Sequence, residues 1–261
     1  MTSVERPSRH HIYPKRYFDA SATWFAWNKL TAKDVHALRE EPGFEGQDIY
    51  FYLNQPIRFV RLVGLVVQID VVSEGRYTLL TLDDSSGANI EVKIEKRSRV
   101  AGDETIYATN TLIDNVDVKV YVGGSTILVN GRPLELGTVI GAQGTITSFR
   151  QSRQLSLKKI FRVQDTNQEA AHWMRAADWK KDILSKPWVL SRQQQDAIDE
   201  QLRQDELKEE KREKLKRKKQ AKYDEKYRQK QAAKEEKREV VEAMLNKGAL
   251  PGSEVLPRPW D

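Results

Sequence analysis

The stretch PIRFVRLVGLVVQIDVV, residues 56–72, decides the fold. It is dense in the β-branched and large apolar residues that favour strands, and Gly64 interrupts it. A glycine inside a long strand permits a sharp coil or a bulge, so one strand can serve both halves of a small closed sheet. We therefore expect residues 56–72 to be the strand on which a β-barrel closes.

Six further short runs of similar composition follow, separated by turn sequences. They are RYTLLTLDD (76–84), NIEVKIEKR (89–97), VDVKVYV (116–122), STILVN (125–130), TVIGAQGTITSF (138–149) and QLSLKKIFRV (154–163). In the second of them Ile90, Val92 and Ile94 alternate with charged residues, which indicates one buried and one wet face. Five main strands, with a two-strand insertion at about 116–130, favour a mainly β fold, a five-stranded Greek-key barrel, over a sandwich.

Helical segments flank the predicted barrel. Thr31 followed by Asp34 is typical of a capping box and predicts a short helix before the barrel. After the barrel, TNQEAAHWMRAADWKKDIL (166–184) predicts a helix capped by Thr166 or Asn167. One apolar stripe of this helix is a candidate partner surface, and it consists of Ala170, Trp173, Met174, Ala177 and Ile183. The alternative is that this stripe covers the open end of its own barrel.

The segment from residue 191 to 240 is strongly charged, with 17 Lys+Arg and 13 Asp+Glu and no Gly or Pro. It is built from good helix formers without a heptad register, so we expect a solvated single helix or a disordered polyampholyte rather than a coiled coil. Its most basic part, KREKLKRKKQAK (211–222), suggests nuclear import or weak phosphate contact, against the alternative of a solvated helix face. Residues 248–261 are rich in Gly and Pro and predict a flexible tail that ends near Trp260.

The composition of the 261 residues excludes several classes of function. There is no cysteine, which removes disulfides, cysteine-ligated zinc and thiol nucleophiles, and the four histidines show no metal-binding spacing. The adjacent Asp83 and Asp84 are better explained as turn formers than as a metal pair. We therefore expect no enzyme, no metal and no cofactor, in a soluble intracellular protein without a membrane span. The net charge of +6 admits an anionic partner.

Candidate nucleic-acid contacts gather at two places along the predicted barrel. Phe149 stands at the hairpin between the fourth and fifth main strands, where a base can stack on it while basic neighbours meet phosphates. The other place is the wet face of the second and third strands. The candidates are Tyr77, Lys93, Lys96, Arg97, Phe149, Arg150, Arg153 and Lys158. The alternatives are that Phe149 packs under its hairpin and that the mixed-charge strand face, which also carries Glu91 and Glu95, is simply solvated.

Five stretches together resemble the fungal Stn subunit of the telomere-capping CST complex, which is itself similar to the middle subunit of replication protein A. The resemblance covers roughly residues 13–185 and lies in the order and spacing of the stretches. They are YPKRYFDASATWFAWNKLTAKDVHAL, PIRFVRLVGLVVQIDVV, YTLLTLDDSSGANIEVKI, LELGTVIGAQGTITSFRQSRQLSLKKI and RVQDTNQEAAHW.

The resemblance implies an OB-fold that pairs with the small OB-fold Ten subunit and binds single-stranded G-rich telomeric DNA, protecting chromosome ends and limiting telomerase. It implies a nuclear, telomeric location, with the large CST subunit and DNA polymerase alpha-primase as further partners. The expected organisation is an N-terminal extension wrapping the barrel (1–55), the OB-fold (56–165), a partner-docking helix (166–186), a long charged helix (187–247) and the tail (248–261).

Two features of the sequence depart from the relatives that this resemblance involves. Many members of the family continue into winged-helix domains, whereas we expect no further core after the charged helix. The replication-protein relatives carry an aromatic at the place of Phe149, but Glu95 stands where they have a second stacking aromatic. Two alternative functions therefore stay open: a scaffold that binds only proteins, and a general replication binder of single-stranded DNA.

Overall fold

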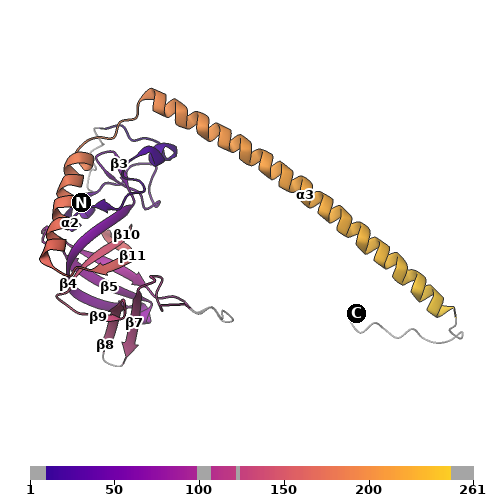
Figure 1. Cartoon of the computed structure of the whole chain (residues 1–261), viewed down its shortest axis with the longest axis horizontal. Helices are drawn as coiled ribbons and strands as arrows, with labels where there is room; N and C mark the ends of the chain where they lie inside the picture. Colours follow the sequence, from indigo (N-terminus) through magenta and orange to yellow (C-terminus); the bar gives the residue numbers. More distant parts are fainter. Residues whose placement is uncertain (1–9, 99–106, 122–123, 248–261) are drawn as a thin grey trace. The chain divides into compact units, whose positions relative to one another are not determined.

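The computed structural model describes residues 10–98, 107–121 and 124–247, and the chain divides into two compact units after Leu190. The described elements are η1 (Lys15–Ala20), β1 (Asn28–Lys29), α1 (Ala32–Ala37), β2 (Tyr50–Tyr52), β3 (Gln55–Ile57), β4 (Phe59–Val72), η2 (Ser73–Gly75), β5 (Tyr77–Asp83), β6 (Asn89–Glu95), β7 (Val116–Tyr121), β8 (Gly124–Val129), β9 (Arg132–Leu134), β10 (Val139–Phe149), β11 (Ser152–Arg162), α2 (Thr166–Trp179), η3 (Lys180–Leu184) and α3 (Arg192–Asn246). All but α3 lie in the first unit (Figure 1).

A closed five-stranded barrel forms the centre of the first unit. Its strands follow one another in the order β4, β10, β11, β6 and β5, and β5 pairs again with β4. The pairing of β11 with β6 is parallel, while the other barrel pairs are antiparallel. This strand order is that of a five-stranded Greek-key OB-fold, so the predicted fold class is confirmed.

The long strand β4 closes the barrel by changing partners near its middle. Leu65 pairs with β10 on one side and with β5 on the other, directly after Gly64. A Cβ on Gly64 would lie 2.8 Å from the carbonyl oxygen of Asp83, and one on Gly144 of β10 would lie 2.3 Å from the carbonyl oxygen of Ser156. These two strands therefore approach their neighbours more closely than any side chain permits.

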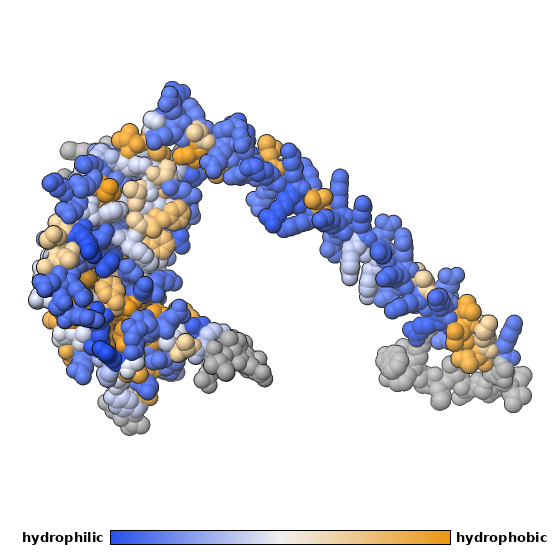
Figure 2. Space-filling view, in the orientation of Figure 1, coloured by the Kyte–Doolittle hydropathy of each residue, from blue (hydrophilic) through white to orange (hydrophobic). Residues whose placement is uncertain are grey.

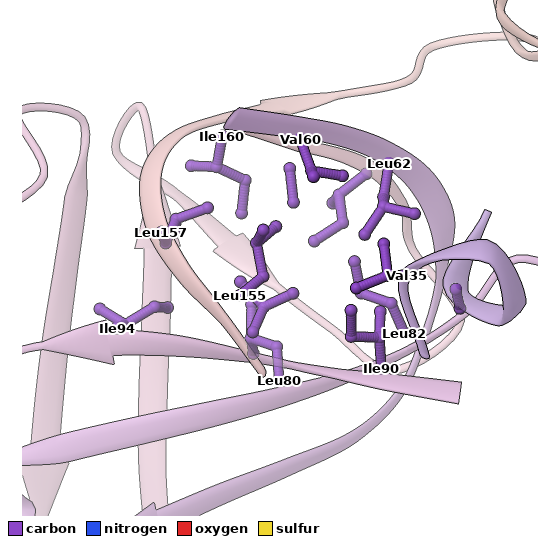
Figure 3. Close-up of a cluster of buried hydrophobic side chains, with 14 of the residues drawn as sticks. Val35, Val60, Leu62, Leu80, Leu82, Ile90, Ile94, Leu155, Leu157 and Ile160 are labelled. Atoms are coloured by element: carbon purple, nitrogen blue, oxygen red, sulfur yellow. The ribbon is translucent and has the colours of Figure 1, made fainter. Parts of the chain in front are cut away.

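Apolar side chains of every barrel strand fill the interior, and Figure 3 shows Val35 entering the same cluster from α1. The predicted capping box begins this helix, with Thr31 and Asp34 satisfying each other's backbone amides. The carboxylate of Asp84 accepts a hydrogen bond from the Ala32 amide at 2.6 Å, which fixes α1 to the end of β5. Both Asp83 and Asp84 also accept backbone amides of the following turn, as expected of turn formers.

A second apolar cluster lies in the N-terminal segment. It consists of Phe18, Trp24, Ile49 and Phe51, with Trp188 packed against it. The buried Asn54 donates to the carbonyl oxygens of His11 and Trp188 and accepts from the Trp188 amide. The segment before the barrel is thereby joined to the segment that follows α2 and η3.

The insertion between β6 and β10 has three strands rather than the predicted two. β7, β8 and β9 form a separate antiparallel sheet. Asn130 and Gly131 both have positive φ angles, 53° and 74°, so they form a two-residue hairpin turn that leads into the extra strand β9.

The cap predicted for α2 was wrong by one or two positions. The N-cap is Asp165, whose side chain accepts the Gln168 amide, rather than Thr166 or Asn167. Asp165 is in extended backbone and its carboxylate reaches an amide three residues on, which is the geometry that a cap requires. α2 continues without a break into the π-helical turn η3.

The second unit is described by one helix, α3, which spans 55 residues from Arg192 to Asn246. Ser191 and Gln194 form a capping box at its start, and pairs such as Glu210 with Lys214 link successive turns. Most of its surface is hydrophilic, with an apolar patch near its end (Figure 2). The exposed members of that patch are Val240, Val241, Met244 and Leu245. Among the described residues, no helix combines the length and apolarity needed to cross a membrane.

We predict that Gly144→Ala destabilises the protein by about 1–3 kcal/mol, the range typical of overpacking, because the added methyl group meets the Ser156 carbonyl. Chemical denaturation measures this change. Thr145→Ala, at a half-buried position on the outer side of β10, is the control and should cost less. Equal unfolding free energies for wild type and Gly144→Ala would contradict the close approach of β10 and β11.

Candidate nucleic-acid and partner surfaces

The outer face of β5 and β6 places an aromatic ring between two cations. The ammonium group of Lys93 lies 5.4 Å from the ring centroid of Tyr77, and the Arg76 guanidinium lies 5.2 Å from it. Arg76 also forms an ion pair with Glu95 at 3.6 Å. Tyr77 pairs directly with Glu95 across the two strands, so one carboxylate stands among these cations.

The hairpin turn between β10 and β11 presents a second aromatic ring. Phe149 is 56% exposed, and the Arg150 guanidinium lies 5.1 Å from its ring centroid. Arg150 and Gln151 both have positive φ angles, 48° and 64°, which makes the turn a tight two-residue connection. Phe149 is therefore held at the tip of the hairpin and not beneath it.

These two groups lie on different parts of the barrel surface, on β5 and on β10. β11 pairs with β6 at Gln154 and Glu91, whereas Tyr77 pairs with Glu95 four residues further along β6. Phe149 lies beyond that pairing, opposite Ser152 at the start of β11. The two rings are therefore on β10 and β5, with β11 and β6 between them.

Two of the predicted arginines hold the fold together instead. Arg153 donates to the carbonyl oxygens of Val35 and His36 at 2.9 and 2.7 Å and lies over the ring of Tyr50. Arg97 donates to the Thr111 carbonyl oxygen and lies 3.9 Å from the ring centroid of Tyr107.

Among the described residues, the ammonium groups of the two remaining predicted lysines form no cation–π contact with either ring. Lys96 is half-buried just beyond β6, where its backbone amide donates to Arg76. Lys158 is exposed at the bulge of β11. In the structure Lys93 therefore lies beside Tyr77, and Arg150 lies beside Phe149. The other four predicted residues, Lys96, Arg97, Arg153 and Lys158, belong to neither pair.

The helix α2 turns different side chains toward the barrel and toward solvent. His172 and Leu184 are buried, and Trp179 packs against the barrel core. On the outer side Trp173 is 40% and Met174 is 66% exposed. Ala170 and Ala177 share this exposed side, whereas Ile183 in η3 is half-buried. Four of the five residues predicted for a partner are therefore free of the barrel.

The inner side of α2 covers a group of cations that sequence reasoning missed. His172 is only 8% exposed and lies near Lys29 of β1, Arg61 of β4 and Arg175 of α2. Burial, reinforced by these three charges and weakly opposed by Asp84, lowers the pKa of His172 to about 4. The position of Arg61 between the buried Val60 and Leu62 signals an outward side chain, but its neighbours come from a strand and a helix that no local pattern links to it.

Comparison with known proteins identifies relatives of one kind. The family model described as "Telomere regulation protein Stn1" matches residues 43–246. "Protein stn1" of Schizosaccharomyces pombe is 25% identical over 159 residues, which are 60% of this chain and 40% of that protein. The rat "CST complex subunit STN1" is 21% identical over 202 residues, 72% of this chain and 46% of that protein. The chain thus spans less than half the length of these relatives.

Solved structures of similar proteins are complexes. The S. pombe Stn1–Ten1 complex contains a chain that is 24% identical, with a TM-score of 0.43, over 61% of this chain and 95% of that one. A yeast Stn1 and Ten1 structure contains a chain that is 18% identical, with a TM-score of 0.48, over 74% and 91%. A replication protein A heterotrimer bound to single-stranded DNA gives a TM-score of 0.39 at 14% identity, over 59% and 94%.

We predict that His172 makes stability depend on pH. Its folded-state pKa of about 4 lies below the unfolded value of about 6.5, so its contribution is complete above pH 6.5 and is lost as the pH falls through 4. His172→Gln should remove on the order of 2 kcal/mol of the change in unfolding free energy between pH 6.5 and 4, measured by urea denaturation in acetate buffer at the acid end and MES buffer at the neutral end. An unchanged pH profile in His172→Gln would contradict the burial of a neutral imidazole.

Proposed function

The chain belongs to the Stn1 family of telomere regulation proteins, and from that premise we propose that it is a chromosome-end capping subunit with two separate binding surfaces. One surface pairs with a small OB-fold protein of the Ten1 kind, and the other binds single-stranded telomeric DNA. The observation that carries the proposal is the apolar outer side of α2, which the barrel leaves exposed. The assembly protects chromosome ends in the nucleus and limits telomerase.

The composition of the outer side of α2 supports the partner surface. Trp173 and Met174 are large, exposed and adjacent, and the small residues Ala170 and Ala177 flank them. Aromatic residues and methionine are enriched at protein interfaces, and a tryptophan set among small neighbours is a frequent anchor. Because Trp179 and Leu184 occupy the barrel side, the outer side is left available to a second protein.

The chemistry of the β5–β6 face and of the β10–β11 hairpin tip supports the DNA surface. Tyr77 and Phe149 offer two rings for base stacking, and Lys93, Arg76 and Arg150 stand beside them for phosphates. Glu95 limits the positive charge of this face through its ion pair with Arg76. We therefore expect weak DNA binding by the chain alone and tighter binding when a partner adds a second barrel, because a linked second site meets the strand at a high effective concentration.

The remaining parts of the function rest on the same family membership. The large CST subunit and DNA polymerase alpha-primase are further proposed partners, and the basic residues 211–222 of α3 are proposed to direct nuclear import. The described residues bring no three metal-ligating side chains together. We propose a role in binding and assembly without catalysis.

A specific observation favours a second candidate function, that of a scaffold which binds only proteins. Arg153 and Arg97, which are the kind of side chain that holds phosphates, are engaged by backbone carbonyls and aromatic rings of the fold. The scaffold function predicts partner binding with no affinity for single-stranded DNA at any salt concentration. Equal affinity for telomeric and scrambled strands would instead indicate a general single-strand binder.

We predict that the double variant Trp173→Ala/Met174→Ala weakens binding of the small OB-fold partner at least tenfold, because it removes the largest exposed apolar side chains of α2. Isothermal titration calorimetry with the purified partner measures the change. The control is Leu136→Ala, which truncates a side chain of similar exposure between β9 and β10 and should bind normally. Normal binding by the double variant would contradict the proposed partner surface.

We predict that Phe149→Ala weakens binding of a G-rich telomeric single strand by roughly tenfold in the partner-bound protein, since stacking contributes about 1–3 kcal/mol per base. Fluorescence anisotropy at several salt concentrations measures it. Phe25→Ala removes a phenylalanine that is also more than half exposed, in the N-terminal segment, and is the matched control. If both variants bind DNA as wild type does, the hairpin tip plays no part in DNA recognition.

A further inference from the structure

A row of polar side chains crosses four neighbouring strands on the outside of the barrel, beneath α2. Lys29 of β1 pairs with Arg61 of β4, Arg61 pairs with Gln143 of β10, and Gln143 pairs with Lys159 of β11. Their chain neighbours Val60, Leu62, Ala142 and Ile160 belong to the core, so the row faces outward. Neighbouring strands are about 4.8 Å apart, which brings Lys29 and Arg61 side by side.

The helix α2 adds charge to one end of this row. Arg175 and His172 face Lys29 and Arg61, and these four groups affect one another's ionisation. Burial, with Arg61 and Arg175 nearby, lowers the pKa of Lys29, and burial also lowers the pKa of Arg61. The half-buried Lys29 and Arg61 and the buried imidazole of His172 therefore lie together between β1, β4 and α2, with the exposed Arg175 near them.

Within the part of the chain that the structure describes, no acidic side chain forms an ion pair with these three cations. None of the ion pairs among the described residues includes Lys29, Arg61 or Arg175. The carboxylate that acts on His172, Asp84, already accepts the amides of Ala32 and Ser86. The cations thus lack the anion that usually accompanies buried positive charge.

Aromatic rings hold two of the cations and leave hydrogen-bond donors unused. Lys29 lies 4.7 Å from the ring centroid of Trp179, and Arg61 lies 4.8 Å from that of Phe161. The Nε–H of Arg61 and the indole N–H of Trp179 are both buried without an acceptor. Unpaired buried donors are rare, and here two of them accompany uncompensated positive charge.

We propose that Lys29, Arg61 and Arg175 form a binding site for a phosphate group. A phosphate oxygen anion supplies both the missing negative charge and the acceptors that the free donors need, and a guanidinium binds it in bidentate fashion. Chloride supplies charge without directed acceptor oxygens, which makes it a poorer match for these donors. The site lies on other strands than the β5–β6 face and on the opposite side of α2 from Trp173, so it stands independently of the proposed function.

The phosphate has two conceivable sources, a free phosphate ion and the backbone of a nucleic acid. The row continues through Gln143 to the exposed Lys159, which gives a polymer a second contact about two strands away. A free ion uses only the end beneath α2. The two sources therefore differ in whether Lys159 matters.

The test is an NMR titration of the His172 imidazole in the full chain. Inorganic phosphate, a single-stranded oligonucleotide, and sodium chloride at matched ionic strength are the three added solutes. A bound phosphate group neutralises the cations around His172 and raises its pKa by about one unit, whereas chloride should leave it nearly unchanged.

Arg175→Met is the first variant, because Arg175 is exposed and its loss leaves the barrel intact. Arg61→Met is the second, and Lys119→Met on β7 is the charge-matched control.

Each result of this titration decides for or against the site. A shift with phosphate or the oligonucleotide that persists in Lys119→Met and weakens at least tenfold in affinity in Arg175→Met and Arg61→Met supports it. A shift with the oligonucleotide that also depends on Lys159 identifies a nucleic-acid backbone as the source. Equal shifts with phosphate and chloride, no shift with any of the three solutes, or shifts untouched in both arginine variants would overturn the site.

Discussion

The closure of the barrel on β4 is the constraint from which the rest of the structure follows. β4 pairs with β10 before Leu65 and with β5 after it, and the lack of a side chain at Gly64 lets it pass close to the Asp83 carbonyl. Because strand side chains alternate, this one register decides which residues of every barrel strand face inward. It sends Tyr77 and Lys93 to one outer face and Arg61 to another, and so creates both candidate sites of the barrel.

A second constraint gives α2 its two unlike sides. Asn54 and Gln55 donate to backbone carbonyls of Trp188, Ile183 and Lys186, so the strands β2 and β3 hold the end of η3 and the segment after it. These hydrogen bonds are partly buried. Leaving a buried amide group without a partner costs more free energy than one hydrogen bond contributes to stability. With its C-terminal end held in this way, α2 commits Trp179 and Leu184 to the barrel and leaves Trp173 and Met174 exposed.

Features that depend only on residues close together in the sequence could be predicted from sequence patterns. Alternation in the run 89–97 predicted its buried face, and Thr31 with Asp34 predicted the capping box. The extra strand β9 was also readable, since Asn130–Gly131 is a strong hairpin signal, but it was overlooked. By contrast, the use of Arg153 to hold α1 and the gathering of Lys29, Arg61 and Arg175 depend on contacts between elements distant in sequence. Neither the spacing of residues nor the composition of a segment indicates contacts between elements that are distant in the sequence.

The measurement that tests the account most directly uses the absence of cysteine from the chain. Single thiols introduced by Ala177→Cys on α2 and by Ser148→Cys beside Phe149 can each be labelled with a maleimide, with and without the small OB-fold partner and a telomeric single strand. We predict that the partner slows labelling only at position 177, and that the DNA slows it only at position 148. Slowing of both positions by the partner, or of neither position by either ligand, would contradict the assignment of two separate surfaces.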